Sequence, residues 1–347
     1  MRPRLSGILI SLLASTLVVL VIAEFAVRAT QGVPMPEKMP LVRVKADPDL
    51  GWVMLPNDVH YTYEIEVRLN SLGFRGPEVE RKVDNEFRIL AIGNSHIYGQ
   101  GLDYDDLLTT RLEAKLNSRG DRCHYRVVNM GIRAFSLNQE YSLLKKLGLT
   151  LDADQVLLFI DINDFYPVDI TQRYLRFRDL EWYMFDLSGR PNDDVLRQWN
   201  RVQFLRRSAL LMLIHDLYRS IFAPESVQQQ ILTGRRTEEI DRLVAVTKKS
   251  LDEIQALSSA QGIRLTVVAV PHRSQVKRSY ENEMYQSVLR AHSNEKGIEF
   301  FDLLPALRSD YRRNQRVPVL PFDGHYDAHG NEVMASAIAA NQTRCTN

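Results

Sequence analysis

The feature that most constrains the fold is a series of five short apolar runs between residues 87 and 303, separated by stretches with helical periodicity. The runs are almost continuously apolar, which is typical of strands buried on both faces. Strands of this kind that alternate with helices form a parallel sheet covered by helices on both sides. The five runs are FRILAIG (87–93), YRVVNMG (125–131), QVLLFID (155–161), RLTVVAVP (264–271) and IEFFDL (298–303).

Two of the intervening stretches carry apolar residues at helical spacing. Leu108, Leu112 and Leu116 recur every four residues, and a second apolar face covers 240–254. We therefore predict an α/β fold with a doubly wound, mainly parallel five-stranded sheet. An insertion rich in aromatic residues and arginine, 166–235, separates the third run from the fourth. It is either a helical cap over an active site or a packing excursion.

The N-terminus contains an uncharged apolar run from Leu5 to Ala23. As a helix, the run covers about 28 Å of a hydrocarbon core about 30 Å thick. Arg2 and Arg4 precede it, so the positive-inside rule keeps the N-terminus cytoplasmic and places the rest of the chain outside the cytoplasm, in the periplasm if the source is bacterial. A cleaved signal peptide is the alternative, but the run exceeds the usual length of about 7–15 residues. We predict a retained transmembrane anchor.

The domain organisation follows from these patterns. The anchor occupies 1–28, and a proline-containing segment with short alternating stretches, 29–85, is expected to be a juxtamembrane stalk that lies on the main domain. The main α/β domain covers 86–347 and contains the insertion.

Composition excludes several classes of function. The 347 residues are 45% hydrophobic and 25% charged, with a formal net charge of +1, so no polyanionic partner is indicated and nucleic acid is not expected. Two cysteines, Cys123 and Cys345, are too few for a disulfide framework, and no Cys/His pattern has zinc spacing. Whether the two cysteines pair stays open, because the sequence does not give the distance between them.

Four of the predicted strands end at or are followed by residues that are common in active sites. Ser95 follows the first run, Gly131 ends the second, Asn163 follows the third, and Asp323 and His325 follow the fifth. Ligands of open parallel sheets bind beyond the carboxyl ends of the strands, so these residues should meet at one edge of the sheet. Together they are the parts of an acyl-transfer site.

Each residue has a predicted role in that chemistry. Ser95 is the nucleophile, and His325 is the base that takes its proton. Asp323 is two positions from His325, so in an extended segment both side chains point the same way and the carboxylate can orient the imidazole. The backbone N–H groups of Ser95 and Gly131 and the Asn163 carboxamide are the expected oxyanion donors.

The sequence resembles the SGNH, or GDSL-like, hydrolases, which are named for a Ser, Gly, Asn and His in four blocks. The resembling segments are AIGNSHIYGQGL, VVNMGIRAFSLNQEY, LLFIDINDF and DGHYDAHGNEVMASAIA, and they extend over most of 86–340. Upstream, DPDLGWVMLPN and NSLGFRG after a single span resemble the lead-in of membrane-anchored bacterial members. The resemblance implies a flavodoxin-like sheet and the same roles for Ser95, Gly131, Asn163 and the Asp323/His325 pair.

The sequence departs from the family pattern at two positions. Asn94 stands where the first block usually has Asp, and Asp161 stands where the third block usually has Gly. A carboxylate at position 161 is expected to lie near the oxyanion site and to weaken it. His329, four residues beyond His325, is the second choice of base, and His96 is a further imidazole beside the nucleophile.

The leading hypothesis is a membrane-tethered, extracytoplasmic serine esterase or O-acyltransferase. Its substrate would be a small acyl ester, with an acetyl ester of a cell-envelope carbohydrate as the leading candidate. The candidate partner is envelope polysaccharide machinery. No cofactor and no metal are implied. The alternative is a catalytically silent module that binds glycan or organises an assembly, with Asn94 and Asp161 as marks of lost activity; a lipase is a third option.

Overall fold

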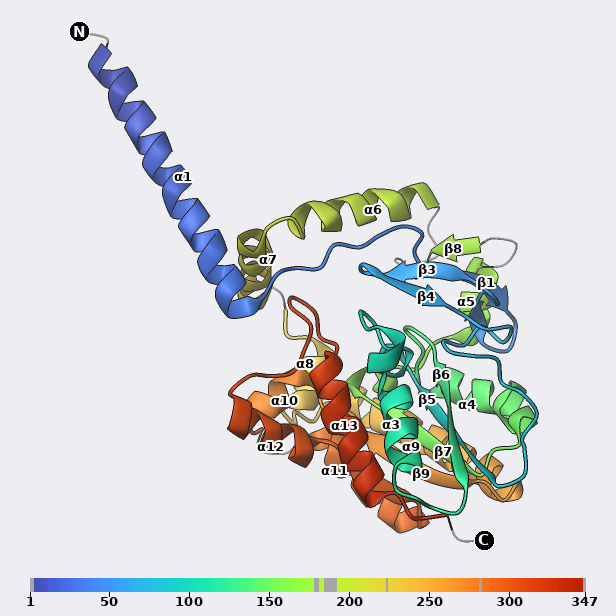
Figure 1. Cartoon of the computed structure of the whole chain (residues 1–347). Helices are drawn as coiled ribbons and strands as arrows, with labels where there is room; N and C mark the ends of the chain where they lie inside the picture. Colours follow the sequence, from blue (N-terminus) through green and yellow to red (C-terminus); the bar gives the residue numbers. More distant parts are fainter. Residues whose placement is uncertain (1–2, 178–180, 184–191, 223, 281–282, 346–347) are drawn as a thin grey trace.

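The computed structural model describes residues 3–177, 181–183, 192–222, 224–280 and 283–345. Its centre is a five-stranded sheet in which every neighbouring pair of strands is parallel (Figure 1). The order across the sheet is β10-β9-β7-β5-β6, so the first of these strands in the chain lies between the second and the third. The predicted doubly wound parallel sheet is therefore confirmed. Its strands are β5 (Glu86–Gly93), β6 (His124–Gly131), β7 (Gln155–Ile160), β9 (Arg264–Ala269) and β10 (Glu299–Asp302).

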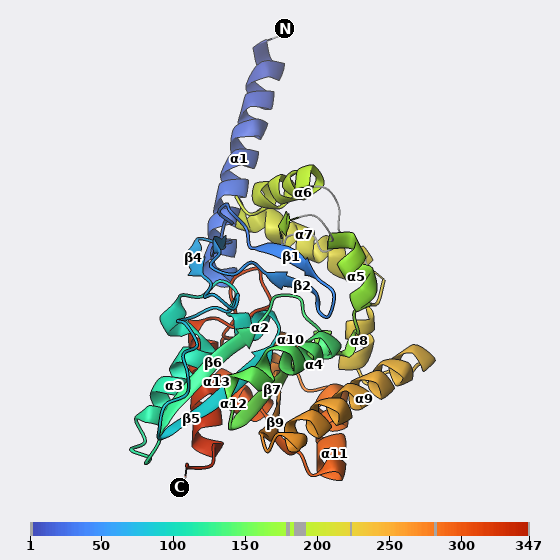
Figure 2. The same ribbon diagram turned by 90° about the vertical axis from the view of Figure 1, so that its right-hand side faces the viewer.

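Helices cover both faces of this sheet (Figure 2). Leu90 and Ile92 of β5 face one hydrophobic cluster, whereas Ile89 and Ala91 face the other, because successive strand residues point to opposite sides. The first cluster includes α4 (Leu137–Lys146), α9 (Glu238–Ala260) and α11 (Met284–Lys296). The second includes α3 (Leu108–Asn117), α12 (Leu304–Asn314) and α13 (Ala328–Asn341).

The segment 29–85, which the sequence predicts to be a stalk lying on the main domain, contributes side chains to the core of that domain. Val44, Trp52 and Phe74 are at most 1% exposed and belong to the same hydrophobic cluster as Leu90 of the central sheet. Strands of the segment form two small antiparallel units: β1 pairs with β2 and also with β8 of the insertion, and β3 pairs with β4. These strands are β1 (Arg43–Asp47), β2 (Gly51–Met54), β3 (Val59–Thr62), β4 (Ile65–Arg68) and β8 (Glu181–Tyr183).

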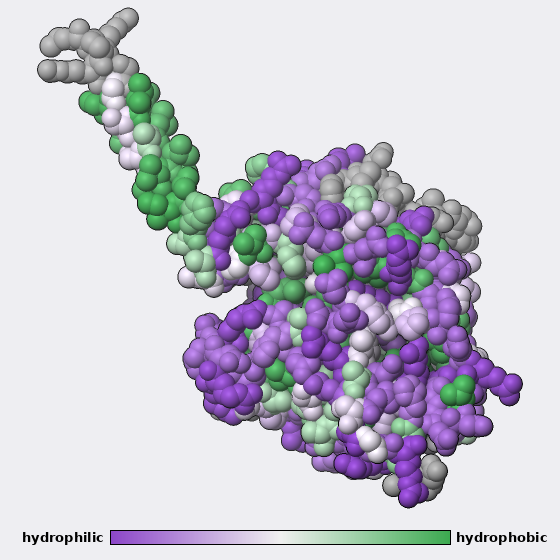
Figure 3. All heavy atoms as spheres, viewed as in Figure 1, coloured by the Kyte–Doolittle hydropathy of each residue, from purple (hydrophilic) through white to green (hydrophobic). Residues whose placement is uncertain are grey.

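The N-terminal helix α1 (Pro3–Gln31) projects from the body of the protein (Figure 1). The stretch Gly7–Gln31 is long and apolar enough to cross a membrane, and its most apolar window is not buried by the rest of the chain. In the space-filling view, α1 is an apolar rod attached to a largely hydrophilic body (Figure 3). A signal sequence near the N-terminus can have the same length and composition. We therefore describe α1 as a candidate membrane span.

The insertion and the connections contribute further helices. Those of the insertion are α5 (Ile170–Phe177), α6 (Asn192–Leu205), α7 (Ala209–Phe222) and α8 (Val227–Leu232). The short helices elsewhere are α2 (Ser95–Tyr98), η1 (Tyr104–Asp106), η2 (Gly148–Leu151), η3 (Ile162–Phe165) and α10 (Arg273–Lys277).

The two cysteines form a disulfide. Cys123 precedes β6 and Cys345 follows α13, and their Cα atoms are 6.2 Å apart. The bridge ties the C-terminal segment to the edge strand of the sheet, and it answers the question that the sequence leaves open.

Candidate active site

Ser95 is the first residue of α2, which begins directly after β5 ends at Gly93. Asn94 caps α2, because its side-chain oxygen accepts a hydrogen bond from the His96 N–H at 3.2 Å. A Cβ atom on Gly93 would lie 2.6 Å from the Ile97 side chain, so glycine permits this sharp turn from strand to helix. The turn places Ser95 at the carboxyl edge of the sheet, between β5 and β7, where the strand order reverses.

The loop before α13 brings His325 and Asp323 to Ser95. The Ser95 Oγ lies 2.7 Å from His325 Nε2, and His325 Nδ1 lies 2.5 Å from Asp323 Oδ1. The backbone N–H of His325 also donates to Asp323 Oδ1 at 2.7 Å. The structure therefore forms one hydrogen-bonded chain from hydroxyl to imidazole to carboxylate, which is the arrangement of a serine nucleophile with its base and its orienting acid.

Tyr63, in the turn between β3 and β4, is a fourth member of this chain that the sequence analysis does not find. Its hydroxyl donates a short hydrogen bond to Asp323 Oδ2, and Gln100 and Arg206 donate to the same hydroxyl, each at 3.4 Å. Burial, with the nearby Asp323 carboxylate, raises the pKa of Tyr63, so the hydroxyl keeps its proton and acts as a donor to Asp323.

The same contacts keep Asp323 ionised. Burial acts to raise the pKa of Asp323, but the charge of His325 and the hydrogen bonds from His325 and Tyr63 outweigh it and hold that pKa well below its usual range. The carboxylate can therefore stabilise an imidazolium on His325 when that ring accepts a proton.

Replacing Tyr63 with phenylalanine tests this contact. The substitution removes one hydrogen bond to Asp323 and keeps the ring, which lies 4.8 Å from the Arg206 guanidinium. We expect kcat to fall about tenfold with little change in KM, since the bond orients the charged partner of the base. Steady-state kinetics with a chromogenic ester measure this effect. Tyr61→Phe on the same hairpin should leave kcat unchanged, and a variant Tyr63→Phe with lower thermal stability but normal kcat would show a structural role alone.

The expected oxyanion donors are placed unequally. Asn163 is the second residue of η3, which follows β7, and it lines the same cavity as Ser95. Gly131 does not line that cavity, and its N–H donates to Asn129 Oδ1 at 2.9 Å. The geometry thus brings Asn163 beside the nucleophile and gives the Gly131 N–H a different partner.

The backbone N–H of Ala134, three residues beyond Gly131, is a candidate for the role expected of Gly131. It lines the cavity, is exposed and has φ of 58°, a left-handed backbone conformation. Among the residues that the structure describes, no acceptor bonds the Ala134 N–H. The sequence carries no signal for this role, because the residue that marks a left-handed position is normally glycine.

Gly131 has a packing role instead. A Cβ atom there would lie 2.1 Å from the Tyr98 backbone nitrogen and 2.5 Å from the Ile97 carbonyl carbon, so β6 passes directly against α2. We expect Gly131→Ala to lower the free energy of unfolding by more than about 3 kcal/mol, because the contact is with backbone that cannot move aside. Chemical denaturation measures this loss. If the variant keeps wild-type stability but loses kcat, Gly131 is an oxyanion donor after all.

The two departures from the family pattern have defined partners. Asn94 Nδ2 lies 3.2 Å and 3.3 Å from the two Asp164 carboxylate oxygens. Asp161 Oδ1 accepts from the Asn163 backbone N–H at 2.6 Å, and its Oδ2 accepts from Asn163 Nδ2 at 3.2 Å. Asp161 therefore holds the Asn163 carboxamide in place. An amide nitrogen carries two hydrogens, so one remains for a ligand in the cavity.

His329 and His96 make different contacts. His329 lies in the first turn of α13, and its Nε2 is 3.0 Å from Asp310 Oδ1. It makes no hydrogen bond to Ser95 among those of the described residues. His96 stacks obliquely on His325 with ring centroids 4.9 Å apart, and its Nε2 lies 3.3 Å from Asp161 Oδ2. The geometry favours His325 over His329 as the base.

Burial, with a smaller contribution from the charge of His325, lowers the pKa of His96 to about 4. An unfolded chain protonates histidine near pH 6.5, so between these values the unfolded state binds more protons than the folded state. Stability from neutral His96 is therefore lost as pH falls from 7 to 4. We expect the difference in unfolding free energy between wild type and His96→Asn to shrink by on the order of 2 kcal/mol over this range. A difference that stays constant with pH would contradict the buried, neutral state of His96.

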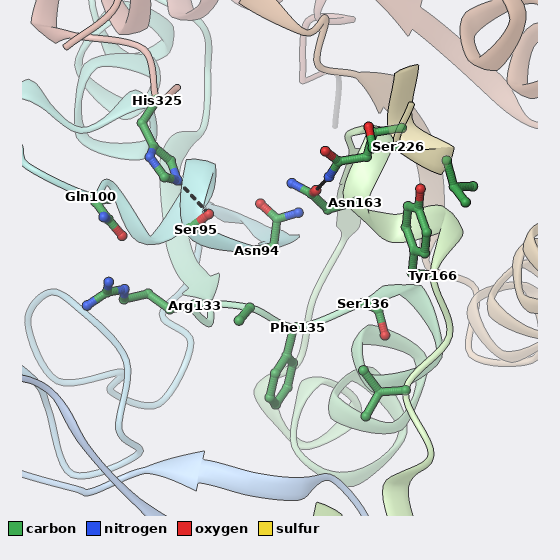
Figure 4. Close-up of a pocket in the computed structure, with 14 residues that line it drawn as sticks. Asn94, Ser95, Gln100, Arg133, Phe135, Ser136, Asn163, Tyr166, Ser226 and His325 are labelled. Atoms are coloured by element: carbon green, nitrogen blue, oxygen red, sulfur yellow. Dashed lines mark hydrogen bonds between the residues drawn. The ribbon is translucent and has the colours of Figure 1, made fainter. Parts of the chain in front are cut away.

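The cavity beside Ser95 has a volume of about 680 Å³ (Figure 4). Its wall comes from the β5, β6 and β7 loops, from the His325 loop and from the start of α8 in the insertion. The polar lining residues besides Ser95 and His325 are Asn94, Gln100, Arg133, Ser136, Asn163, Tyr166, Ser226 and Gln228. Ten of the fourteen lining residues have polar side chains. The insertion residues Ser226 and Gln228 form part of the wall, so the insertion contributes to the site.

No family model matches the sequence, and no curated protein matches it. Among solved structures, the chain is similar to the acetyl xylan esterase AlAXEase, with 12% identity, coverage of 74% of this chain and 99% of that chain, and a TM-score of 0.45. It is similar to a member of the lipolytic protein G-D-S-L family from Veillonella parvula, with 13% identity, 73% and 97% coverage and a TM-score of 0.42. It is also similar to a catalytic mutant of the acetylxylan esterase Axe2 from Geobacillus stearothermophilus, with 12% identity, 73% and 93% coverage and a TM-score of 0.43.

Proposed function

We propose that the chain is a membrane-tethered, extracytoplasmic serine esterase or O-acyltransferase of the SGNH type. Its substrate is a small acyl ester, and the leading candidate is an acetyl ester of a cell-envelope carbohydrate. The observation that carries the proposal is the hydrogen-bonded chain from Ser95 through His325 to Asp323, which opens into the cavity.

The chemistry follows from this geometry in two half-reactions. His325 Nε2 takes the Ser95 proton while Oγ attacks the ester carbonyl, and the tetrahedral oxyanion is held by the Ser95 N–H, the Ala134 N–H and the Asn163 carboxamide. Collapse breaks the carbon–oxygen bond to the alcohol, which leaves with the proton from His325. Water, or a sugar hydroxyl, then gives a proton to His325 and attacks the acyl carbon. Collapse of this second tetrahedral intermediate breaks the bond between the acyl carbon and Ser95 Oγ, and Oγ takes the proton back from His325.

The cavity lining supports a carbohydrate more than a lipid chain. Gln100, Asn163 and Gln228 offer carboxamides to sugar hydroxyls, and Tyr166 and Phe135 offer aromatic surface. The apolar lining residues are Ala134, Phe135, Val168 and Val227, and none of them is a leucine, isoleucine or methionine. The volume of about 680 Å³ lies within the range of small-molecule sites.

The membrane tether and the compartment are supported by two features. The uncharged helix α1 follows Arg2 and Arg4, which favours a cytoplasmic N-terminus. The disulfide between Cys123 and Cys345 fits an oxidising compartment. A C-terminal reporter that is active only in the cytoplasm would contradict this topology, and a mature N-terminus near Glu24 would contradict the retained anchor.

The proposal is tested on the full chain in detergent or nanodiscs with a fluorophosphonate probe and with p-nitrophenyl acetate. We expect the wild type to label at one residue and to hydrolyse the acetate, and we expect Ser95→Ala to do neither. Ser226→Ala, which removes another hydroxyl from the same cavity wall, is the matched control and should label normally. A folded wild type that neither labels nor hydrolyses would overturn the enzyme and leave the silent glycan-binding module.

A further inference from the structure

The α7 helix has an apolar stripe on its solvent side, where a surface helix normally carries polar residues. Stripe residues recur at every third or fourth position along the helix, so they lie on one face. Their exposed fractions range from 36% to 69%, whereas Ala209 and Met212 of the same helix are buried against the protein. The stripe consists of Leu211, Ile214, Leu217, Tyr218, Ile221 and Phe222.

The start of α7 is fixed to the end of the apolar run in α1. Glu24 is the first charged residue after that run, and its carboxylate accepts from the Ser208 hydroxyl at 2.6 Å and from the Ala209 and Leu210 N–H groups at 3.0 Å and 2.9 Å. These are contacts that cap the N-terminus of α7. Because Glu24 marks the level at which α1 leaves the hydrocarbon, α7 begins at the same level.

The orientation of α7 places its length along that level. In Figure 1, α7 is seen nearly end-on at the foot of α1, and in Figure 2 it runs across the foot of α1 instead of alongside it. A helix in this position lies roughly parallel to the surface of a membrane that α1 crosses.

The charge of the surrounding segment fits an anionic lipid surface. From Asn192 to Phe222, which covers α6 and α7, the sequence has five arginines and three acidic residues, Asp193, Asp194 and Asp216. Arg207 and Arg219 are exposed at the two ends of α7. An exposed apolar stripe combined with arginines is typical of helices that lie in the membrane interface.

We propose that α7 lies in the outer interface of the membrane that α1 spans, with its apolar stripe against the acyl chains. The inference rests on the membrane tether proposed above and adds a second attachment to it. A single span would leave the domain free to rotate and tilt, whereas a second, interfacial helix fixes one face of the domain to the lipid.

This attachment sets the position of the catalytic groups relative to the membrane. Arg206, in the short connection between α6 and α7, donates to the Met35 carbonyl at 3.1 Å and lies over the Tyr63 ring. Tyr63 in turn donates to Asp323. The contacts link the interfacial helix to the catalytic loop, so the cavity opens at a fixed height above the lipid and suits a substrate held at the membrane surface.

The test uses single cysteines in the full chain, reconstituted in liposomes that contain phosphatidylglycerol and carrying a nitroxide spin label. The native cysteines are paired in the disulfide, so the introduced thiol is the one that reacts. Leu217→Cys and Ile221→Cys report the stripe, Asp216→Cys and Ser220→Cys report the polar face, and Leu13→Cys reports α1. Accessibility to oxygen, which concentrates in lipid, and to a water-soluble nickel chelate is measured at each site.

We expect the stripe positions to be at least threefold more accessible to oxygen than to the nickel chelate, relative to the polar-face positions, and Leu13 to be the most buried in lipid. Stripe positions as accessible to nickel as Asp216, with Leu13 in lipid, would overturn the interfacial helix and leave the tether standing. Nickel access at Leu13 would overturn the tether itself. Repetition at one copy per nanodisc separates lipid from a second copy: loss of protection there would mean that another protomer covers the stripe.

Discussion

His325→Ala should lower kcat by at least about 10⁴-fold, because the ring that accepts the Ser95 proton is lost and no other side chain among the described residues hydrogen-bonds Oγ. The side chain of His325 is 21% exposed, so the variant should fold and keep near-native thermal stability. Turnover of p-nitrophenyl acetate, measured beside a melting curve, gives both quantities.

His329→Ala is the matched control for this prediction. The side chain of His329 is 47% exposed, and its ring contacts Asp310 and not Ser95. Loss of this ring should therefore leave kcat within about twofold of wild type. If His325→Ala keeps near-full activity, the base has been assigned wrongly.

Two further variants separate the parts of the chain of hydrogen bonds. Asp323→Asn should lower kcat strongly and leave the fold intact, since an amide can neither select the productive imidazole tautomer nor stabilise the imidazolium. The double variant Ser95→Ala with His325→Ala should lose little more than either single variant, because residues that act as one unit are not additive.

The parts of the fold that could be predicted from sequence are those with a local signal. The strands β5, β6, β7 and β9 are largely buried on both faces, so each appears as a mostly apolar run. The edge strand β10 is only partly buried. Once the runs are ordered in a parallel sheet, their carboxyl ends meet at one edge. Ser95 and Asn163 could be placed together for that reason, and the spacing of Asp323 and His325 needed only an extended loop.

Residues whose role depends on contacts between distant segments could not be predicted. Tyr63 lies 260 positions from Asp323 in the sequence, in a hairpin that carries no motif, and only the folded chain brings the two together. The same holds for the segment 29–85, whose apolar residues join the core of the main domain although their pattern suggests only short strands.

The oxyanion donors show a different limit. Glycine at 131 is a reasonable signal for close approach, but the structure uses it for the approach of the α2 backbone, and the left-handed turn that faces the cavity is at Ala134. A left-handed alanine has no signature in sequence, because the conformation is imposed by the surrounding fold at a cost of about 1–2 kcal/mol. The carboxylate of Asp161, expected to weaken the site, is the acceptor that orients Asn163.

Asn163→Ala is expected to lower kcat by a factor of about 10²–10³ with little change in KM. The carboxamide donates to negative charge that develops on the carbonyl oxygen in the transition state, so its removal raises the barrier and hardly alters binding of the neutral ester. Steady-state kinetics with p-nitrophenyl acetate separate kcat from KM, and a melting curve checks the fold.

Gln228→Ala is the control that distinguishes donation from orientation. Gln228 donates to the Asn163 carboxamide oxygen from the exposed side of the cavity, so its removal leaves the Asn163 nitrogen in place and Asp161 still holding it. We expect kcat to fall less than about tenfold in Gln228→Ala, because a hydrogen bond of this kind contributes about 1 kcal/mol. Equal losses in the two variants would make Asn163 a positioning residue. A large loss of thermal stability in Asn163→Ala, with kcat of the folded fraction preserved, would make it a turn residue whose contact with Asp161 serves only to begin η3.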